Sequence, residues 1–149
     1  MQIRQTIKIV AAAKEDGEIL ANLRALAMRE SLESAGRYDP VRVRDRFLAG
    51  FEPINTKMVL VEGKLVGFYM TTDQGDHIYI DHFYIHPDFQ GRKIGSYLLN
   101  LIVAQARKKD KIVRLGALKG SRSNSFYLSH GFVKTHEEEF DKYYELQHP

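Results

Sequence analysis

The alternation of hydrophobic and polar positions divides the chain into short strand-like runs and longer helix-like segments. Runs rich in β-branched and aromatic residues predict strands, and these are 6–13, the two halves of 57–72, 77–85, 111–119 and two runs within 132–147. Apolar residues at helical spacing predict helices, and these are 18–34, 40–50, 90–109 and 122–130. The resulting order, β-α-α-β-β-β-α-β-α-β-β, is typical of an α/β domain around a mixed sheet.

Residues at the ends of these segments support the division. Glu62-Gly63 separates two β-rich halves and predicts a hairpin. Asp16 and Asp39 stand where they can cap the first two helices. Gly36 can take the left-handed position after the first helix, and Gly50 can end the second. Two helices are therefore expected before a three-strand meander.

Composition indicates one compact domain, residues 1–149. With 149 residues and 44% hydrophobic content, the chain can form one core and is too short for two ordinary domains. It has no cysteine for a disulfide framework and no secretion-signal pattern, so we expect a cytoplasmic protein. The longest apolar stretch, YLLNLIVAQA, is roughly half of the ~20 residues that a membrane span needs, so no membrane partner is expected.

The charge distribution favours an anionic ligand over a nucleic acid. The net charge is +3, and the 22 basic and 19 acidic side chains are interspersed. A nucleic-acid-binding helix would carry clustered basic residues and exposed aromatic ones, whereas the segment 90–109 is apolar nearly all round. We therefore expect no nucleic-acid partner.

The stretch PDFQGRKIGSYLLN, residues 87–100, follows directly on the apolar strand IYIDHFYI. A strand that runs through a glycine-bearing turn into a helix exposes unpaired backbone N–H groups at the positive end of the helix dipole. Such a site suits phosphate. It lacks the Lys-Ser/Thr ending of a P-loop, and no strand is followed by G-x-G-x-x-G. By itself this pattern fits an anion site and an ordinary strand-to-helix turn about equally.

Two motifs resolve this ambiguity. The run QGRKIGSYLL resembles the central motif of the GNAT superfamily of acyl-CoA-dependent N-acyltransferases: Arg or Gln, two residues, Gly, one residue, then Gly or Ala. The matching positions are Ile85, Pro87, Gln90 and Gly95. The run FYLSHGF resembles the second family motif, in which three residues separate a Tyr from Gly-Phe, and its matching positions are Phe126, Tyr127, Gly131 and Phe132. With the two N-terminal helices and the meander, the resemblance spans essentially the whole chain.

The resemblance implies a GNAT-like fold, a mixed and mainly antiparallel sheet flanked by helices with a splayed central strand pair. It implies acetyl-CoA as co-substrate and no metal. Backbone amides of the turn would hold the pyrophosphate, and the thioester would lie between the strands 77–85 and 111–119, its carbonyl polarised by a backbone N–H near Phe83 to Ile85. The implied CoA-binding residues are Phe83, Tyr84, Ile85, Gln90, Gly91, Arg92, Lys93, Ile94, Gly95, Ser96, Asn124 and Tyr127.

Two positions depart from the family pattern. Lys93 replaces the first glycine, which adds a charge but requires a backbone angle that a non-glycine residue can hold. Gly120 stands where many members have Asn, and Asn124 can take over part of that contact.

Asp81 and His82 are the ionisable groups within the central strand and the candidate bases for deprotonating an amine. Regular alternation places them on opposite faces, so they act together only if a bulge intervenes, and the resemblance implies such a bulge. A structural hydrogen bond is an equally good interpretation of each. Tyr127 is the candidate proton donor to the departing CoA sulfur; packing alone is the alternative.

The acceptor is expected to approach along the first two helices, where Arg29, Glu33 and Tyr38 are the candidate binding residues. A surface ion pair between Arg29 and Glu33 is the simpler interpretation of that pair. His77, His82 and His86 do not share one strand face, which argues against a metal site.

The sequence thus predicts an N-acetyltransferase that moves acetyl from acetyl-CoA directly to an amine of a small molecule or peptide. The alternative is a CoA-binding sensor or interaction module without catalysis. Acceptor identity is not predicted, and the sequence leaves a monomer or a homodimer open.

Overall fold

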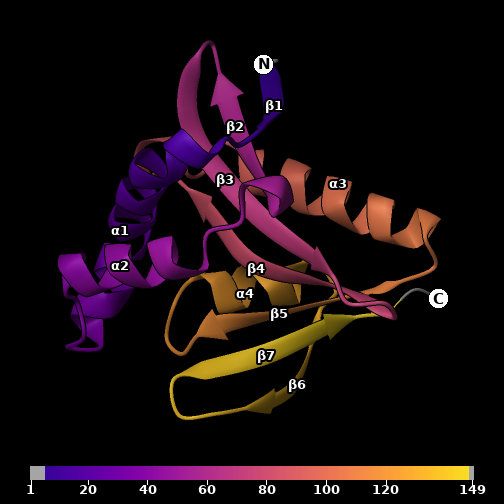
Figure 1. Ribbon diagram of the computed structural model, residues 1–149. Coiled ribbons are helices and arrows are strands. Elements are labelled where there is room, and N and C mark those ends of the chain that lie inside the picture. Colours follow the sequence, from indigo (N-terminus) through magenta and orange to yellow (C-terminus); the bar gives the residue numbers. More distant parts are fainter. Residues whose placement is uncertain (1–5, 148–149) are drawn as a thin grey trace.

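The computed structural model describes residues 6–147 and places a seven-stranded mixed sheet at their centre (Figure 1). The strands are β1 (Ile7–Ala11), β2 (Thr56–Val61), β3 (Lys64–Asp73), β4 (His77–Ile85), β5 (Ile112–Leu118), β6 (Val133–Glu137) and β7 (Asp141–Leu146). The helices are α1 (Gly17–Ser34), α2 (Pro40–Gly50), α3 (Ile94–Lys108) and α4 (Ser123–Ser129). In the strand order β1-β2-β3-β4-β5-β7-β6, every neighbouring pair is antiparallel except β4 and β5. The predicted mixed, mainly antiparallel α/β fold is confirmed.

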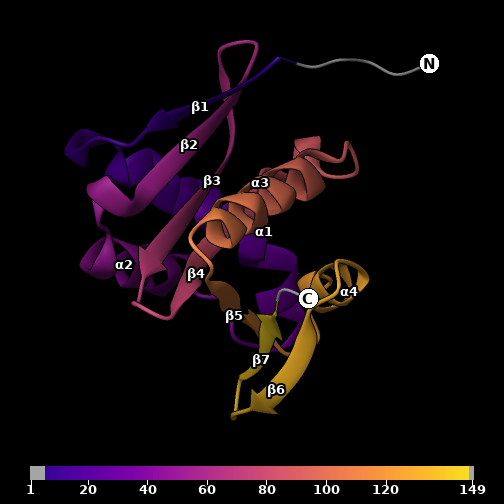
Figure 2. The same cartoon turned by 90° about the vertical axis from the view of Figure 1, so that its right-hand side faces the viewer.

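The helices cover both faces of the sheet. In Figure 2, α3 lies in front of the sheet, with α1 and α2 behind it. Leu98, Leu99 and Ile102 of α3 belong to the main core, together with sheet residues on that side. A second core joins Leu20 of α1 and Phe47 of α2 to the other face. Each sheet face therefore has its own apolar layer, and β4 lies between the two.

The one parallel strand pair separates partway along its length. His77 to Ile80 of β4 pair with Ile112 to Leu115 of β5, and beyond these residues β5 pairs with β7 while β4 pairs with β3. Gly116 stands where the separation begins, and a Cβ there would lie 2.8 Å from the Tyr143 ring. A side chain is therefore excluded at this point, and the predicted splayed pair is confirmed.

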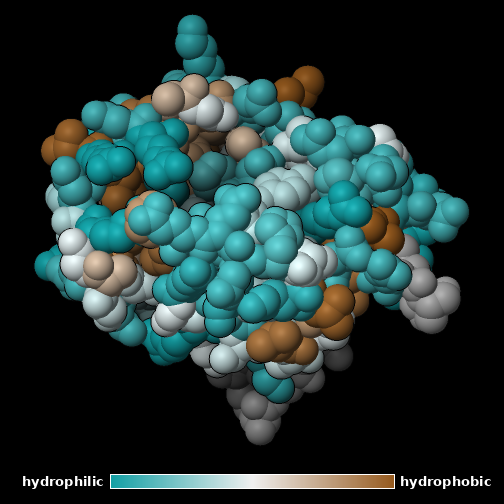
Figure 3. Space-filling view, turned by 90° about the horizontal axis from the view of Figure 1, so that it is seen from below, coloured by the Kyte–Doolittle hydropathy of each residue, from teal (hydrophilic) through white to brown (hydrophobic). Residues whose placement is uncertain are grey.

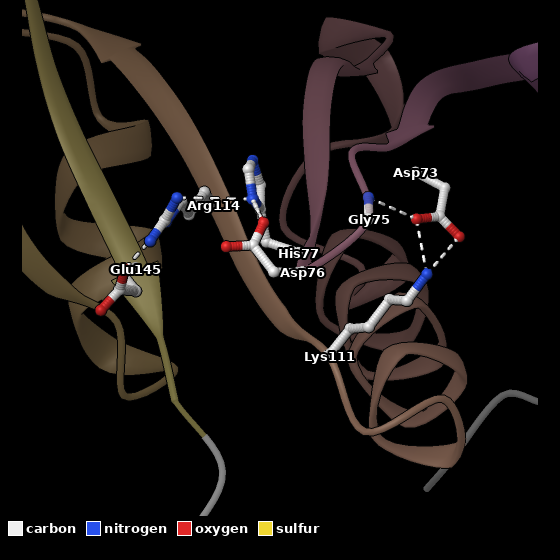
Figure 4. A network of polar contacts seen from close by, with 7 residues as sticks. All are labelled: Asp73, Gly75, Asp76, His77, Lys111, Arg114 and Glu145. Atoms are coloured by element: carbon white, nitrogen blue, oxygen red, sulfur yellow. Dashed lines mark hydrogen bonds and ion pairs between the residues drawn. The ribbon is translucent and has the colours of Figure 1, made fainter.

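Polar contacts hold the closed end of the splayed pair (Figure 4). Lys111 donates from Nζ to both carboxylate oxygens of Asp73, at 2.6 and 2.7 Å, and this contact keeps the pKa of Asp73 below its usual value. Arg114 of β5 contacts His77 Nδ1 at 3.4 Å and Glu145 of β7 at 2.9 Å. The network joins the ends of β3, β4, β5 and β7, so the strands open only at the opposite end.

A bulge in β4 lies just beyond the last parallel pair. Met70 of β3 faces His82 and the next residue, Thr71, faces Ile80, so Asp81 is the extra residue. Before the bulge Ile80 belongs to the main core, and after it Phe83 packs on that same core. The extra residue therefore reverses the alternation of side chains. The bulge implied by the family resemblance is present.

Most residues predicted to begin or end the helices do so, with two corrections. The Asp39 carboxylate caps α2 by accepting from the N–H groups of Val41 and Arg42, and Gly36 is left-handed with φ 68°. Asp16 precedes α1 but makes no side-chain cap; its carboxylate accepts from Ala13 N–H instead. The third helix begins at Ile94 rather than residue 90, because a turn and a left-handed residue precede it.

Figure 3 looks from below onto the end of the molecule where β6 and β7 lie. Hydrophilic side chains cover most of that face, and hydrophobic ones form small separate patches. Within residues 6–147, no helix is long and apolar enough to cross a membrane.

Candidate active site

The turn between β4 and α3 presents a row of unpaired backbone donors. Gly91 and Lys93 have left-handed backbones, with φ of 80° and 65°. No backbone N–H group of residues 91–96 donates a hydrogen bond to any residue that the structure describes, whereas Tyr97 N–H already bonds Lys93 O. These free donors lie at the N-terminus of a fifteen-residue helix. The unpaired donors that the sequence predicts are therefore present, and the binding of an anion by them stays a prediction.

Side chains around the turn fix its shape and add positive charge. Gln90 donates from Nε2 to Ile85 O at 3.1 Å and so ties the turn to the end of β4. The Arg92 guanidinium lies 4.8 Å from the centre of the Phe89 ring. Ser96 Oγ lies 3.1 Å from His130 Nε2, which links α3 to α4. The turn is thus braced from β4 and from α4.

A cavity of about 440 Å³ opens beside this turn and is called the cofactor cavity. It is lined by residues of the turn, by the end of β4 and by α4. A Cβ on Gly95 would lie 3.4 Å from Phe126, an ordinary contact distance. Packing within the protein therefore does not require glycine at this position, and the predicted close approach of a ligand stays a prediction.

A second cavity, the slot, continues from the cofactor cavity into the splayed region. It shares Phe83, Ile85 and Gln90 with the cofactor cavity and reaches Leu118 of β5 and Met28 of α1. His86 N–H bonds Val66 O of β3 at 2.7 Å, and N–H directions alternate along a strand. The N–H groups of Phe83 and Ile85 therefore point away from β3, toward the slot.

Tyr127 of α4 lies in the wall of the cofactor cavity. Its side chain is buried, and its hydroxyl makes no hydrogen bond within residues 6–147. Burial first, and then Tyr84, raise the pKa of Tyr127. Its ring packs edge-on against Phe83, 6.5 Å between centres. The structure thus holds a neutral, unpaired O–H donor at the cavity.

A third cavity, of about 480 Å³, lies on the opposite side of the slot and is called the acceptor cleft. It shares Met28, Tyr84 and Leu118 with the slot. The bulge brings Asp81 and His82 together into its lining. The three cavities thus form a continuous series from the turn to the far side of the sheet.

The environment of His82 keeps its imidazole neutral. Its ring packs 5.1 Å from the centre of Phe47, and its Nδ1 lies 3.3 Å from the Tyr84 hydroxyl. Burial, with a smaller effect of Arg24, lowers the pKa of His82 to about 4. His82 is therefore unprotonated at neutral pH, and its lowered pKa makes it a weak base.

Asp81 differs in its surroundings. Its carboxylate accepts a hydrogen bond from the Thr72 hydroxyl. Burial raises the pKa of Asp81, and the Thr72 bond opposes that effect. Both candidate bases line one cleft, and each also makes a structural contact.

Other predicted residues lie outside these cavities. Arg29 forms an exposed ion pair with Glu33 at 3.1 Å and lies 5.6 Å from the centre of the Tyr38 ring. None of the three lines the acceptor cleft. Asn124 donates to Leu118 O and Ser121 O and accepts from the Tyr144 hydroxyl, so its polar atoms shape the turn before α4. For these four residues, a ligand contact remains a prediction.

Sequence reasoning did not select several residues that line the cleft. They are Arg24, Arg42, Arg46, Phe140 and Tyr143. Arg42 and Arg46 lie four residues apart on a predicted helix, which is a readable signal for a shared face. Phe140 and Tyr143 come from the far end of the chain, and no sequence pattern connects them to α2.

His77, His82 and His86 face different surroundings. His77 contacts Asp76, His82 contacts Tyr84, and His86 accepts from Asp88 N–H. Residues 6–147 contain no group of three or more His, Cys, Asp or Glu side chains placed to hold a metal ion.

Comparison with known proteins adds a family and a set of solved folds. A family model described as "Acetyltransferase (GNAT) domain" matches residues 55–134. The PaiA N-acetyltransferase from Thermoplasma acidophilum, solved in complex with coenzyme A, is 20% identical with a TM-score of 0.72 over 96% of this chain and 99% of that one. An acetyltransferase from Thermus thermophilus is 13% identical with a TM-score of 0.76, covering 98% and 99%.

The ribosomal-protein-S18-alanine N-acetyltransferase from Escherichia coli is 16% identical, with a TM-score of 0.70 over 95% of this chain and 93% of that one. No curated protein matches the sequence. Topology and the family model together define a class of enzymes that transfer acyl groups from coenzyme A. The chain belongs to the GNAT family of acetyltransferases, and acetyl-CoA is its co-substrate.

Proposed function

We propose that this protein transfers acetyl from acetyl-CoA directly to the amine of a small molecule or peptide. The observation that carries the proposal is the continuous series of cavities, in which the slot shares residues with the cofactor cavity on one side and with the acceptor cleft on the other. An amine in the cleft can then meet a thioester in the slot without a covalent enzyme intermediate.

The turn supplies the binding of the co-substrate in this proposal. The free N–H groups of residues 91–96, with Arg92 and Lys93 beside them, bind the pyrophosphate. The N–H groups of Phe83 and Ile85 donate to the thioester oxygen, where negative charge develops during attack. Fixed backbone donors need no rearrangement as that charge appears, so they favour the transition state over the bound substrate.

Proton transfers complete the reaction. The amine nitrogen forms a bond to the carbonyl carbon and loses a proton to His82 or Asp81, directly or through water. The carbon–sulfur bond breaks, and Tyr127 donates its O–H toward the departing sulfur. Burial keeps His82 unprotonated at neutral pH, as a base must be, but the same burial makes it a weak base. We further propose that residues 1–149 act as one cytoplasmic N-acetyltransferase domain.

A panel of amines and peptides incubated with acetyl-CoA tests this function, with released thiol and acetylated product measured together. Acceptor-dependent release matched by product supports direct transfer. Tight CoA binding with only slow, acceptor-independent hydrolysis across the panel would instead identify a CoA-binding module. Gly95→Asp is the control, because bulk and negative charge at the turn should abolish CoA binding while circular dichroism shows the fold retained.

A further inference from the structure

Three of the four arginines that line the acceptor cleft make no side-chain hydrogen bond or ion pair within residues 6–147. Arg24 is engaged, since its Nη1 donates to Val43 O at 2.6 Å and its Nε donates to the Tyr84 hydroxyl at 3.2 Å. Within residues 6–147, no carboxylate oxygen lies within 4.0 Å of a guanidinium nitrogen of Arg37, Arg42 or Arg46. The cleft therefore presents unneutralised positive charge beside the proposed reaction site.

Arginines elsewhere on the same elements are neutralised. Arg44, which lies on α2 between the two cleft arginines, contacts Glu18 and donates to Asn22 Oδ1 at 2.7 Å. Arg29 of α1 pairs with Glu33 at 3.1 Å. The unpaired state of Arg42 and Arg46 is thus a feature of the helix face that borders the cleft, and other arginines of α1 and α2 do not share it.

This arrangement carries an electrostatic cost that an anion would relieve. Arg42 and Arg46 stand at positions i and i+4 of α2, where like charges repel each other. Arg42 also lies in the first turn of the helix, where the dipole disfavours a cation. The nearby Asp39 carboxylate is occupied by the backbone N–H groups of Val41 and Arg42. An anion bound between the two guanidinium groups would remove these unfavourable terms.

Arg37 adds a third guanidinium and limits the size of the cleft. Its guanidinium carbon lies 3.7 Å from the centre of the Phe140 ring. Stacking of this kind leaves the N–H edges of the group available for a carboxylate or phosphate. The contact also joins the loop after α1 to the turn between β6 and β7. The cleft of about 480 Å³ is thereby bridged, which favours a small ligand over an extended chain.

The negative groups of the cleft are placed differently. Asp39 caps α2, and its carboxylate is occupied by backbone N–H groups. Asp81 lies at the bulge of β4, beside the slot, and Asp141 comes from the start of β7. Arg42 and Arg46 come from a different element, the helix α2, and both side chains are exposed. An acceptor with an amine at one end and an anionic group at the other matches this separation of charge.

We propose that the acceptor is a small amine carrying a carboxylate or phosphate group, with the anionic group bound by Arg42 and Arg46. The inference rests on the proposed acetyl transfer for the position of the amine. It goes beyond that transfer by assigning the chemical class of the acceptor and the residues that select it.

Matched ligand pairs test the proposal by calorimetry on the full chain saturated with CoA. Each pair differs in one anionic group: amino acids against their carboxamides, and phosphoethanolamine against ethanolamine. We expect at least one anionic member to bind about 10-fold or more tightly than its neutral partner, because one charge-assisted contact is typically worth that much. Arg42→Gln and Arg46→Gln should each remove much of the preference, and the double variant should abolish it.

Arg107→Gln, at the exposed C-terminal end of α3, is the control for the loss of net charge and should leave the preference intact. In the cleft variants CoA affinity should stay constant, since the cleft arginines lie outside the cofactor cavity. Their melting temperature should not fall, since each substitution removes one of two like charges on α2. Four outcomes would each overturn the proposal. Two concern the ligand pairs: the neutral partners bind as tightly as the anionic ones, or no anionic amine binds. The other two are a preference that survives in the double variant and a preference for an acidic peptide over small amines.

Thiol release with the same ligands separates this inference from the proposed function. A ligand preference that depends on Arg42 and Arg46, without acetyl transfer to any bound amine, would leave the anion site in place and refute the transfer. Transfer to neutral and anionic amines with equal kcat/KM, unchanged in the double variant, would support acetyl transfer and refute the anion site.

Discussion

Replacing Lys93 by glycine should strengthen the fold and weaken CoA binding at the same time. Lys93 holds a left-handed backbone at φ 65° directly before α3. That conformation costs a non-glycine residue about 1–2 kcal/mol. Glycine avoids this cost but loses about 0.4–1 kcal/mol through its more flexible unfolded chain. The net gain is about 0.5–1 kcal/mol, which corresponds to a rise of about 1–4 °C in melting temperature for a chain of this size.

The expected loss of CoA affinity follows from the loss of the Lys93 charge. The proposed contact between the Lys93 ammonium and the pyrophosphate is exposed to solvent, where an ion pair is worth about 0.5–1 kcal/mol. Lys93→Gly should therefore raise the Kd for CoA about two- to fivefold. The dependence of that Kd on salt should become shallower, because one screened charge has been removed.

Lys93→Ala is the matched variant, since it removes the charge but keeps the left-handed cost. Calorimetric titration at several salt concentrations should show equal losses of CoA affinity in the two variants. Urea and thermal unfolding should show a gain in stability for glycine only. Equal stability of the two variants would refute the strain argument, and a wild-type Kd with a wild-type salt dependence would refute the phosphate contact.

Four further outcomes are expected. Tyr127→Phe should lower kcat about tenfold or more, with little change in CoA affinity or melting temperature. The loss should be modest because general acid catalysis is typically worth ~10²- to 10⁴-fold and burial raises the pKa of Tyr127, which makes it a weak acid. Single-turnover rates equal to wild type would leave packing as its role. Gly95→Ala should fold at least as stably as wild type, because Cβ there meets Phe126 at an ordinary 3.4 Å, yet bind CoA more weakly, and unchanged calorimetric affinity would contradict the proposed close approach. The free energy of unfolding, measured by urea titration, should fall by up to about 3 kcal/mol between pH 6.5 and about 4. It falls because unfolding lets His82 bind a proton that the folded state excludes. His82→Gln should flatten that decrease. If His82 is the base, kcat/KM, corrected for the fraction of free amine, should decline only as the pH approaches the folded-state pKa of about 4. A decline that persists in both His82→Gln and Asp81→Asn would exclude both.

Local interactions explain why the sequence alone predicted so much of this molecule. Apolar periodicity located the strands and helices, since each element must present an apolar side to a core. The Asp39 cap and the left-handed Gly36 act within a few residues of themselves, so their signals can be read from short windows. The turn at 90–96 is of the same kind, because its free N–H groups arise wherever a strand passes through such a turn into a helix.

The tertiary structure decided what depends on contacts between distant segments. The bulge at Asp81 requires the register of β3 against β4, and it alone brings Asp81 and His82 to one cleft. The lowered pKa of His82 requires burial against Phe47, which comes from a helix far earlier in the chain. The acceptor cleft likewise needs α2, β4 and the turn before β7 to meet. Sequence patterns report what a residue does to its neighbours along the chain, whereas the chemistry of this cleft depends on neighbours that only folding supplies.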